Sequence, residues 1–193
     1  MKTIFLTIIP ILSFNLTFGQ LTNDCFSDAN YQRNMDLKNA PQVKVGDSAN
    51  HIITSVETAL AKIIGCKFPY APFRTTTGKE LTYDKIKSDF IVINFNYLFC
   101  DRCTNQLDSL VKIKKASKKT ITIVSFFACD KNDIKHLTDK FKDEVLFVTN
   151  ANNYTKNYDL GSGRPLNYIL DRGKIIIYAD FDVSQILNPY LLK

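Results

Sequence analysis

One segment near the middle of the chain restricts the fold more than any other, because a dense apolar run leads into two closely spaced cysteines. Residues 90–95 are rich in β-branched and aromatic side chains, which is typical of a strand buried on both faces. Cys100 and Cys103 follow this run, and apolar residues at helical spacing come next. A buried strand, a CxxC pair and a helix in this order favour redox chemistry.

Further segments continue the alternation of strands and helices up to the end of the chain. In order, the sequence predicts a strand at 121–128, a helix at 131–142, a strand at 145–148, a helical turn at 153–158, strands at 166–170 and 174–178, and a helix at 183–192. Such alternation predicts an α/β fold with a central mixed, mainly parallel sheet flanked by helices. The last two strands are joined by a turn at 171–173 and add antiparallel pairing.

The first residues have the pattern of a secretory signal peptide. Met1 and Lys2 are followed by an uncharged, mostly apolar run, and Thr17 and Gly19 place small residues where a signal peptidase cuts. We therefore predict a cleaved signal peptide at 1–19 and an exported protein of the periplasm or cell envelope. A short buried helix or an uncleaved anchor is the alternative, although the run is short for a bilayer. Lipidation at Cys25 is disfavoured by the aspartate directly before it.

The rest of the chain divides into an extension and a main domain. Residues 20–64 are predicted as an N-terminal extension that contains one amphipathic helix, beginning near Ser48 and ending at Gly65. The polar stretch 21–50 lacks clear periodicity and is predicted as loop. The main domain is assigned to 65–193 and starts with a short hairpin at 73–82.

Composition excludes several classes of protein. With 45% hydrophobic and 23% charged residues, the chain can build a globular core and is not disordered. The net charge is +6, but the lysines near residues 112–119 are best interpreted as a solvated helix face, and no nucleic-acid-reading motif is present. No segment after the signal peptide is long and apolar enough to be predicted as a membrane span.

The position of the cysteine pair explains why it is a candidate catalytic centre. A thiolate is the nucleophile in disulfide exchange, and the free N–H groups and dipole at a helix N-terminus stabilise it. We therefore predict Cys100 as the attacking thiol and Cys103 as the resolving thiol. Arg102 adds a nearby cation, whereas Asp101 opposes the thiolate.

Two other interpretations of the pair remain open. The cysteines can form an inert structural disulfide, or they can be half of a zinc site. Zinc needs a second pair of ligands, and the two histidines, His51 and His136, have no paired partner in the sequence. We predict no metal site and no bound cofactor.

Three sequence blocks resemble the TlpA/ResA-like branch of the thioredoxin family. They are the cysteine-bearing block 90–103, the opening hairpin block 65–81, and the block 163–175 that contains Gly163-Arg164-Pro165. The resemblance implies a thioredoxin fold and thiol–disulfide exchange. It also implies that Pro165 is cis and lies beside the cysteines, where the backbone of Arg164 pairs with an extended substrate. An ordinary strand-entry proline and an exposed loop arginine are the alternatives.

Several residues depart from the pattern of the resembled family. Phe99, predicted to contact substrate, stands where that family usually carries tryptophan, and Arg102 stands where a proline is common. Gln106 replaces a frequent glutamate, and an amide cannot accept a proton from the resolving thiol. We expect Arg102 and Gln106 to tune the site.

The remaining three cysteines have separate expectations. Cys25 and Cys66 can form a disulfide that ties the extension to the domain. Cys129 follows the second buried strand and is either a buried thiol or a third redox participant. An odd number of cysteines leaves at least one without an intramolecular partner.

These observations favour an envelope thiol–disulfide oxidoreductase. The family resemblance implies that it reduces disulfides in exported proteins, and oxidation or isomerisation stays open as its role. Its partners are then the thiols and disulfides of exported proteins, together with an envelope thiol that donates electrons. The alternative is a non-catalytic thioredoxin-fold module that binds a peptide and keeps a structural disulfide. A copper-delivery protein is a third interpretation, although such proteins use differently spaced cysteines and a histidine.

Overall fold

The structure is a computed structural model that describes residues 24–39, 48–69, 71–160 and 165–182. The signal peptide predicted at 1–19, the helix predicted at 183–192 and the side chain of Arg164 lie outside the described residues.

A five-stranded sheet forms the centre of the molecule, with the strand order β5-β4-β3-β6-β7. The strands are β3 (Phe90–Asn96), β4 (Ile121–Phe127), β5 (Val145–Val148), β6 (Leu166–Leu170) and β7 (Ile176–Asp180). Strands β3, β4 and β5 run parallel, whereas β6 is antiparallel to both β3 and β7. The predicted mixed sheet is therefore confirmed, and its last strand begins two residues later than predicted.

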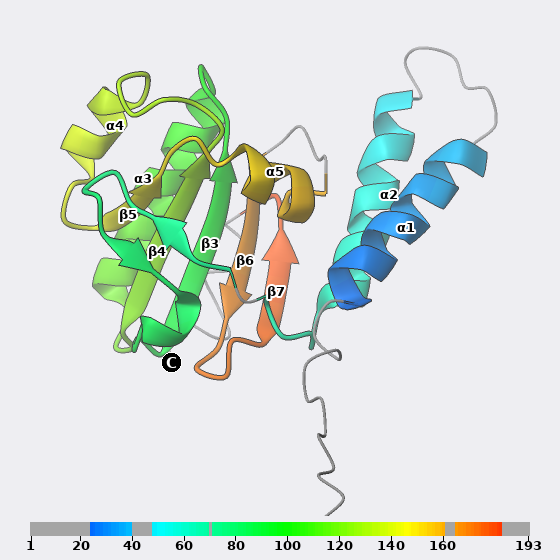
Figure 1. Cartoon of the computed structure of the whole chain (residues 1–193), viewed down its shortest axis with the longest axis horizontal. Helices are drawn as coiled ribbons and strands as arrows, with labels where there is room; N and C mark the ends of the chain where they lie inside the picture. The colour runs from blue at the N-terminus through cyan, green and yellow to red at the C-terminus, as the bar shows by residue number, and fades with distance from the viewer. Residues whose placement is uncertain (1–23, 40–47, 70, 161–164, 183–193) are drawn as a thin grey trace, which may run out of the picture.

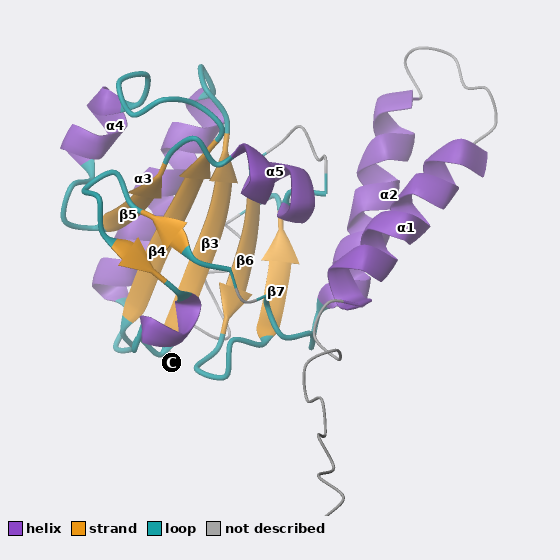
Figure 2. Ribbon diagram, in the orientation of Figure 1, coloured by secondary structure: helices purple, strands orange, loops and turns teal. Residues whose placement is uncertain are grey.

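Helices cover both faces of this sheet (Figures 1 and 2). Helices α3 (Asp101–Ala116) and α4 (Lys135–Lys140) lie on one face, where Val92 and Ile123 meet Leu107 and Leu137 in one apolar cluster. The other face is covered by α5 (Asn152–Tyr158) and by a small hairpin, and the N-terminal helices lie beside β7 and contribute to the apolar cluster of that face. Because both faces are buried, nearly every residue of β3 and β4 is inaccessible to solvent.

The small hairpin pairs β1 (Phe73–Arg74) with β2 (Glu80–Leu81), and a 3-10 helix η1 (Tyr83–Lys85) follows it. The turn contains Gly78 at φ +85°, a left-handed conformation that glycine adopts without steric cost. The hairpin predicted at 73–82 is thereby confirmed.

Helix α4 is shorter than the helix predicted at 131–142. The backbone N–H of Asp130 donates to the carboxylate of Asp133 at 3.0 Å, and this local bond holds residues 130–133 in a turn. The chain therefore becomes helical only at Lys135.

Among the described residues, two helices rather than one precede the hairpin. Helix α2 (Ser48–Ile63) matches the predicted amphipathic helix, and Gly65 follows it at φ +86°. The expectation of a loop at 21–50 was wrong for α1 (Asp24–Asn39). Helix α1 has little amphipathic periodicity of its own, and tertiary contacts stabilise it instead. Within the described part of the chain, no helix has the length and apolarity needed to cross a bilayer.

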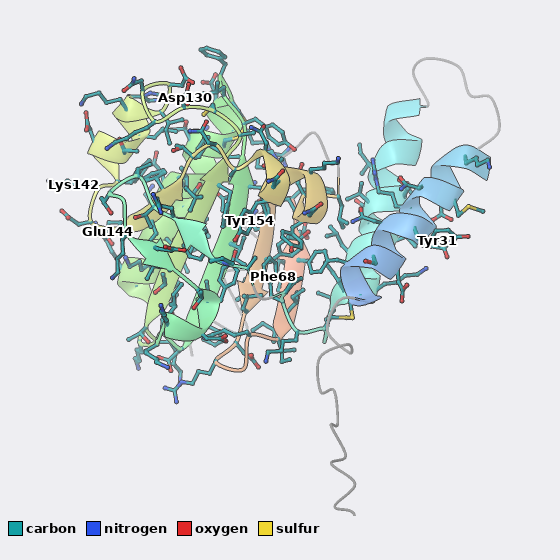
Figure 3. The ribbon with its side chains drawn as sticks, in the orientation of Figure 1. Tyr31, Phe68, Asp130, Lys142, Glu144 and Tyr154 are labelled. Carbon is teal, nitrogen blue, oxygen red and sulfur yellow. A yellow bond between two sulfur atoms is a disulfide. The ribbon has the colours of Figure 1, made fainter. Side chains whose placement is uncertain are left out.

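An aromatic cluster attaches α1 to the rest of the molecule. The ring of Phe26 makes edge contacts with Phe68, Tyr158 and Tyr168 at centroid distances of 5.5, 5.2 and 5.8 Å. Figure 3 shows Phe68 between α1 and the sheet, whereas Tyr31 lies on the outer side of the same helix. Residues of both N-terminal helices thus belong to the same apolar cluster as one face of the sheet.

Candidate active site

The cysteine pair lies where the carboxyl end of β3 meets the N-terminus of α3. Cys100 is the N-cap of α3, and its Sγ accepts the backbone N–H of Cys103 at 3.1 Å. The carbonyl of Cys100 accepts the N–H groups of Cys103 and Thr104 at 3.0 and 3.2 Å. The predicted strand-to-helix junction is therefore present, and one N–H group of the first helical turn, that of Cys103, points to the Cys100 sulfur.

The two sulfurs are bonded to each other as Cys100–Cys103, with their Cα atoms 5.2 Å apart. Cys100 is partly exposed, whereas Cys103 is only 1% exposed on the inner side of α3. This difference matters because a large substrate can reach only the sulfur of Cys100.

Phe99, directly before Cys100, has an unusual conformation. Its backbone φ is +54°, and its side chain is fully exposed. A bulky residue at positive φ is strained, and strain of this kind tends to persist at functional sites. Arg102 and Asp101, on the first turn of α3, are exposed as well.

A pocket of about 210 Å³ opens beside the cysteines, between residues 97–104 and the start of α4. The buried side chains of Phe127, Ile134 and Leu137 contribute its apolar floor, and Asp101 and Asp133 contribute carboxylates. Sequence reasoning did not identify the residues from 127–137 as part of the site. They are far from Cys100 in the sequence, and only the parallel pairing of β3 with β4 brings them close.

A line of buried polar side chains crosses the sheet on the α3 side. Asn94 Nδ2 donates to Asn167 Oδ1 at 2.7 Å, and Ser125 Oγ donates to Asn94 Oδ1 at 3.1 Å. Asn96 Nδ2 donates to Ser125 Oγ at 2.8 Å. At the other end, Asn167 Nδ2 donates to Gln106 Oε1 at 3.2 Å. Among these residues, sequence reasoning identified Gln106 but missed Asn96, Ser125 and Asn167.

Gln106 lies one turn after Cys103 on α3 and is 6% exposed. Its Nε2 donates to the backbone carbonyl of Phe181, while its Oε1 accepts from Asn167. Both the donor and the acceptor of the Gln106 amide therefore form hydrogen bonds. An ionised glutamate at this position has no N–H or O–H, so it could not donate to the Phe181 carbonyl. This polar line consists of amides and a hydroxyl, so it stabilises the packing but provides no acidic or basic group for Cys103.

The C-terminal end of α5 is connected to the cysteine loop. The hydroxyl of Tyr97 donates to the carboxylate of Asp159, which is buried at the end of α5. Phe95 at the end of β3 pairs with Leu166 at the start of β6, which places the buried Pro165 at the same end of the sheet as Cys100. The Arg164–Pro165 peptide bond, predicted to be cis, involves a residue outside the described ones.

The other three cysteines lie away from the exchange position or are weak nucleophiles. Cys25 and Cys66 are bonded to each other, which is the pairing that the sequence left as a possibility, and the carbonyl of Cys66 accepts the N–H of Ile176 at 2.9 Å. Ile176 lies at the beginning of β7, at the opposite end of the sheet from Cys100. Cys129 is unpaired and half-buried, and burial raises the pKa of its thiol, with Asp133 and Asp130 adding to the effect. Asp130 lies in the loop beyond β4 (Figure 3).

A mixed sheet of this strand order, with a CxxC pair at the junction of β3 and α3, is a thioredoxin fold.

No protein-family model matches the sequence, and no curated protein matches it. Solved structures do match. A thioredoxin-like protein from Bacteroides caccae superposes with a TM-score of 0.55 at 18% identity, over 78% of this chain and 56% of that one. The chain therefore spans little more than half the length of this relative.

Two shorter relatives match over almost their whole length. The thioredoxin domain of a thiol-disulfide oxidoreductase from Bacteroides vulgatus has a TM-score of 0.53 at 19% identity, over 65% of this chain and 98% of that one. A thiol:disulfide interchange protein from Bacteroides sp. has a TM-score of 0.50 at 16% identity, and the match covers 65% of this chain and 91% of that protein. Identities this low establish the fold that these proteins share with the chain.

Proposed function

We propose that this protein is a thiol–disulfide oxidoreductase that reduces disulfides in exported proteins of the periplasm or cell envelope. The observation that carries the proposal is the exposure of Cys100 at the N-terminus of α3, with its bonded partner Cys103 buried behind it. No bound cofactor is required, because the electrons are carried by the sulfurs themselves.

The reaction consists of two exchanges. In the reduced protein, the Cys100 thiolate attacks one sulfur of a substrate disulfide, so that a mixed disulfide forms and the other substrate sulfur leaves as a thiolate that takes up a proton. The Cys103 thiolate then attacks the Cys100 sulfur, the Cys100–Cys103 bond forms, and the second substrate thiolate is released and protonated. The substrate gains two electrons, and the protein is oxidised to the state described above.

A second dithiol must return the protein to its reduced state. We propose an envelope thiol donor that attacks the oxidised pair by the same exchange in reverse and is itself oxidised to a disulfide. The helix N-terminus supports both directions, because it stabilises Cys100 as attacking thiolate and as leaving group. Deprotonation of Cys103 is assigned to solvent, since Gln106 lacks a basic group.

The other predicted site residues enter the proposal as substrate contacts. Phe99 presents an exposed ring beside Cys100, and Pro165 lies at the same end of the sheet. We propose that an extended substrate segment pairs with the backbone before Pro165 and contacts Phe99, while Arg164 and Arg102 add positive charge near the thiolate. Export is supported by the Cys25–Cys66 disulfide, which persists in oxidising compartments.

A second candidate function is favoured by one observation. The buried line from Ser125 to Gln106 has no group that can take the proton of Cys103. This absence favours the second candidate, a non-catalytic module that binds a peptide and keeps Cys100–Cys103 as a structural disulfide.

Insulin reduction in the presence of dithiothreitol separates the two candidates. We expect the wild type to accelerate reduction, Cys100→Ser to remove the acceleration, and Cys103→Ser to accumulate a mixed disulfide that is visible by mass spectrometry. Cys129→Ser is the matched control and should behave as wild type, because this thiol is unpaired and its pKa is raised by burial. A wild type that gives no acceleration over dithiothreitol alone contradicts the enzyme and supports the binding module.

The equilibrium reduction potential of the pair tests the direction of electron flow. A value near that of thioredoxin, about −270 mV, agrees with a reductase, and a value near about −120 mV identifies an oxidant instead.

A further inference from the structure

We propose that the pocket beside Cys100 selects substrates that carry a lysine or an arginine next to the cysteine under attack. This inference rests on the proposed thiol–disulfide exchange and adds a substrate preference to it. The occupant is a single long basic side chain, whose aliphatic stem lies on the apolar floor and whose charged head reaches the carboxylates.

The shape and lining of the pocket fit the stem of such a side chain. Phe127, Ile134 and Leu137 are at most 5% exposed and form an apolar floor next to the cysteine pair. The methylene groups of lysine and arginine bury well against such a surface while the head stays in water. Phe99 lines the same pocket with a fully exposed ring, and the face of an aromatic ring attracts a cation.

The charges around the pocket fit the head group. Asp101 and Asp133 line the pocket together with the imidazole of His136, and none of its described lining residues is a lysine or an arginine. One oxygen of Asp133 accepts the N–H of Asp130, and the carboxylate has further acceptor sites. A chain with a net charge of +6 thus has a local excess of negative charge at the opening beside Cys100.

The nearby lysines form their hydrogen bonds with groups other than these carboxylates. Lys131 Nζ donates to the carbonyl of Thr76 at 2.9 Å, and Lys135 Nζ pairs with Asp139 at 2.5 Å. Arg102 is exposed on the first turn of α3 and does not line the pocket.

A substrate cation at this position also assists the chemistry. Asp101 and Asp133 repel the negative charge of the Cys100 thiolate, since like charges near a group disfavour its ionised form. A lysine or arginine of the substrate placed between them offsets this repulsion during the attack. The pocket therefore links recognition of the substrate to the reactivity of Cys100.

The test compares three disulfide-bonded peptides that differ at one residue after the target cysteine, namely lysine, norleucine or glutamate. For wild type we expect kcat/KM for the lysine peptide to exceed that for the norleucine peptide by about fivefold, with glutamate lowest, as for a semi-exposed ion pair. Asp101→Asn and Asp133→Asn should each reduce the lysine preference about twofold, and the double variant should remove it. Salt at about 1 M should weaken the preference of the wild type.

Asp28→Asn is the matched control, because it makes the same charge change on the exposed surface of α1, outside the pocket. Its lysine preference should equal that of wild type. Equal kcat/KM values for the three peptides in an active wild type overturn the pocket assignment and leave the exchange activity intact.

If the wild type is inactive, that result contradicts the proposed function, and a binding measurement then tests the pocket assignment separately. Fluorescein-labelled peptides with serine in place of each cysteine are titrated with the oxidised protein, and binding is followed by anisotropy. Tighter binding of the lysine peptide that is lost in the Asp101→Asn, Asp133→Asn variant supports the pocket assignment. Equal binding of the three peptides overturns it.

Discussion

At the scale of single residues, Phe99 combines two features that are unfavourable for folding. Its backbone occupies the left-handed region at φ +54°, and its ring is fully exposed and contributes no buried area. Strain at an exposed aromatic residue beside Cys100 agrees with the substrate contact that we propose for Phe99.

Two substitutions at this residue separate backbone strain from the role of the ring. Both Phe99→Ala and Phe99→Gly remove the ring, but only glycine adopts positive φ without steric cost. We expect the free energy of unfolding of Phe99→Gly to exceed that of Phe99→Ala by about 0.5–1 kcal/mol, measured by urea denaturation. Both variants should lower kcat/KM for a protein substrate. An alanine variant at least as stable as the glycine variant contradicts the strained conformation.

At the scale of elements, Asp89 connects three parts of the sheet. Its carboxylate accepts the backbone N–H and the hydroxyl of Thr120, both at 2.8 Å, and it pairs with Arg172 in the turn between β6 and β7. The bonds from Thr120 and then Arg172 lower the pKa of Asp89 to about 2. The beginnings of β3 and β4 and the turn between β6 and β7 are thus held together at the end opposite the cysteines.

This depressed pKa has a consequence for stability in acid. A carboxyl whose pKa is lower in the folded state stabilises the fold above its unfolded pKa and loses that contribution as the pH falls through the folded value. We expect Asp89→Asn to flatten the decrease in unfolding free energy between about pH 4 and pH 2, measured by urea titrations at several pH values. Asp28→Asn on α1 serves as control. A variant with the same pH dependence as wild type contradicts the contribution of Asp89.

Elements that depend on local pattern were predictable, and elements that depend on distant contacts were not. Strand β3 was predicted because its residues are apolar on both faces, whereas α1 was missed because its stability comes from Phe26 and the Cys25–Cys66 bond. The cysteine site followed from its spacing. The pocket floor did not, because its residues become neighbours of Cys100 only after β3 pairs with β4.

The buried polar line left a signal in the sequence that the strand predictions did not use. Asn96, Ser125 and Asn167 interrupt otherwise apolar strands, and a polar residue in such a strand indicates a buried partner. The sequence does not show which of these residues are partners, because that depends on the strand register. In the sheet, the register places Asn94 opposite Ser125 on β4 and opposite Asn167 on β6.

At the scale of the whole molecule, one disulfide and one apolar cluster join the N-terminal helices to the sheet. The Cys25–Cys66 bond closes a loop with a sequence separation of 41 residues. Closing a loop of this length restricts the unfolded chain by about 4 kcal/mol in the chain-entropy treatment.

The variant that lacks this disulfide should be less stable but still active. We expect Cys25→Ala, Cys66→Ala to lose about 2–4 kcal/mol of unfolding free energy in urea. Its insulin reduction at a temperature where it is folded should equal that of wild type, because the bond lies at the opposite end of the sheet from Cys100. Loss of activity in a folded variant would show that the N-terminal helices contribute to the exchange site.

The placement of the two disulfides at opposite ends of the sheet also bears on how the protein matures. Seven residues of β3 separate the two ends, a span of roughly 20 Å, which is far beyond the reach of direct sulfur-to-sulfur attack. A folded molecule therefore cannot pass its own Cys100–Cys103 bond to Cys25 and Cys66. If Cys25 and Cys66 pair only after folding, their oxidation has to come from another molecule, either a separate thiol oxidant or a second copy of this chain.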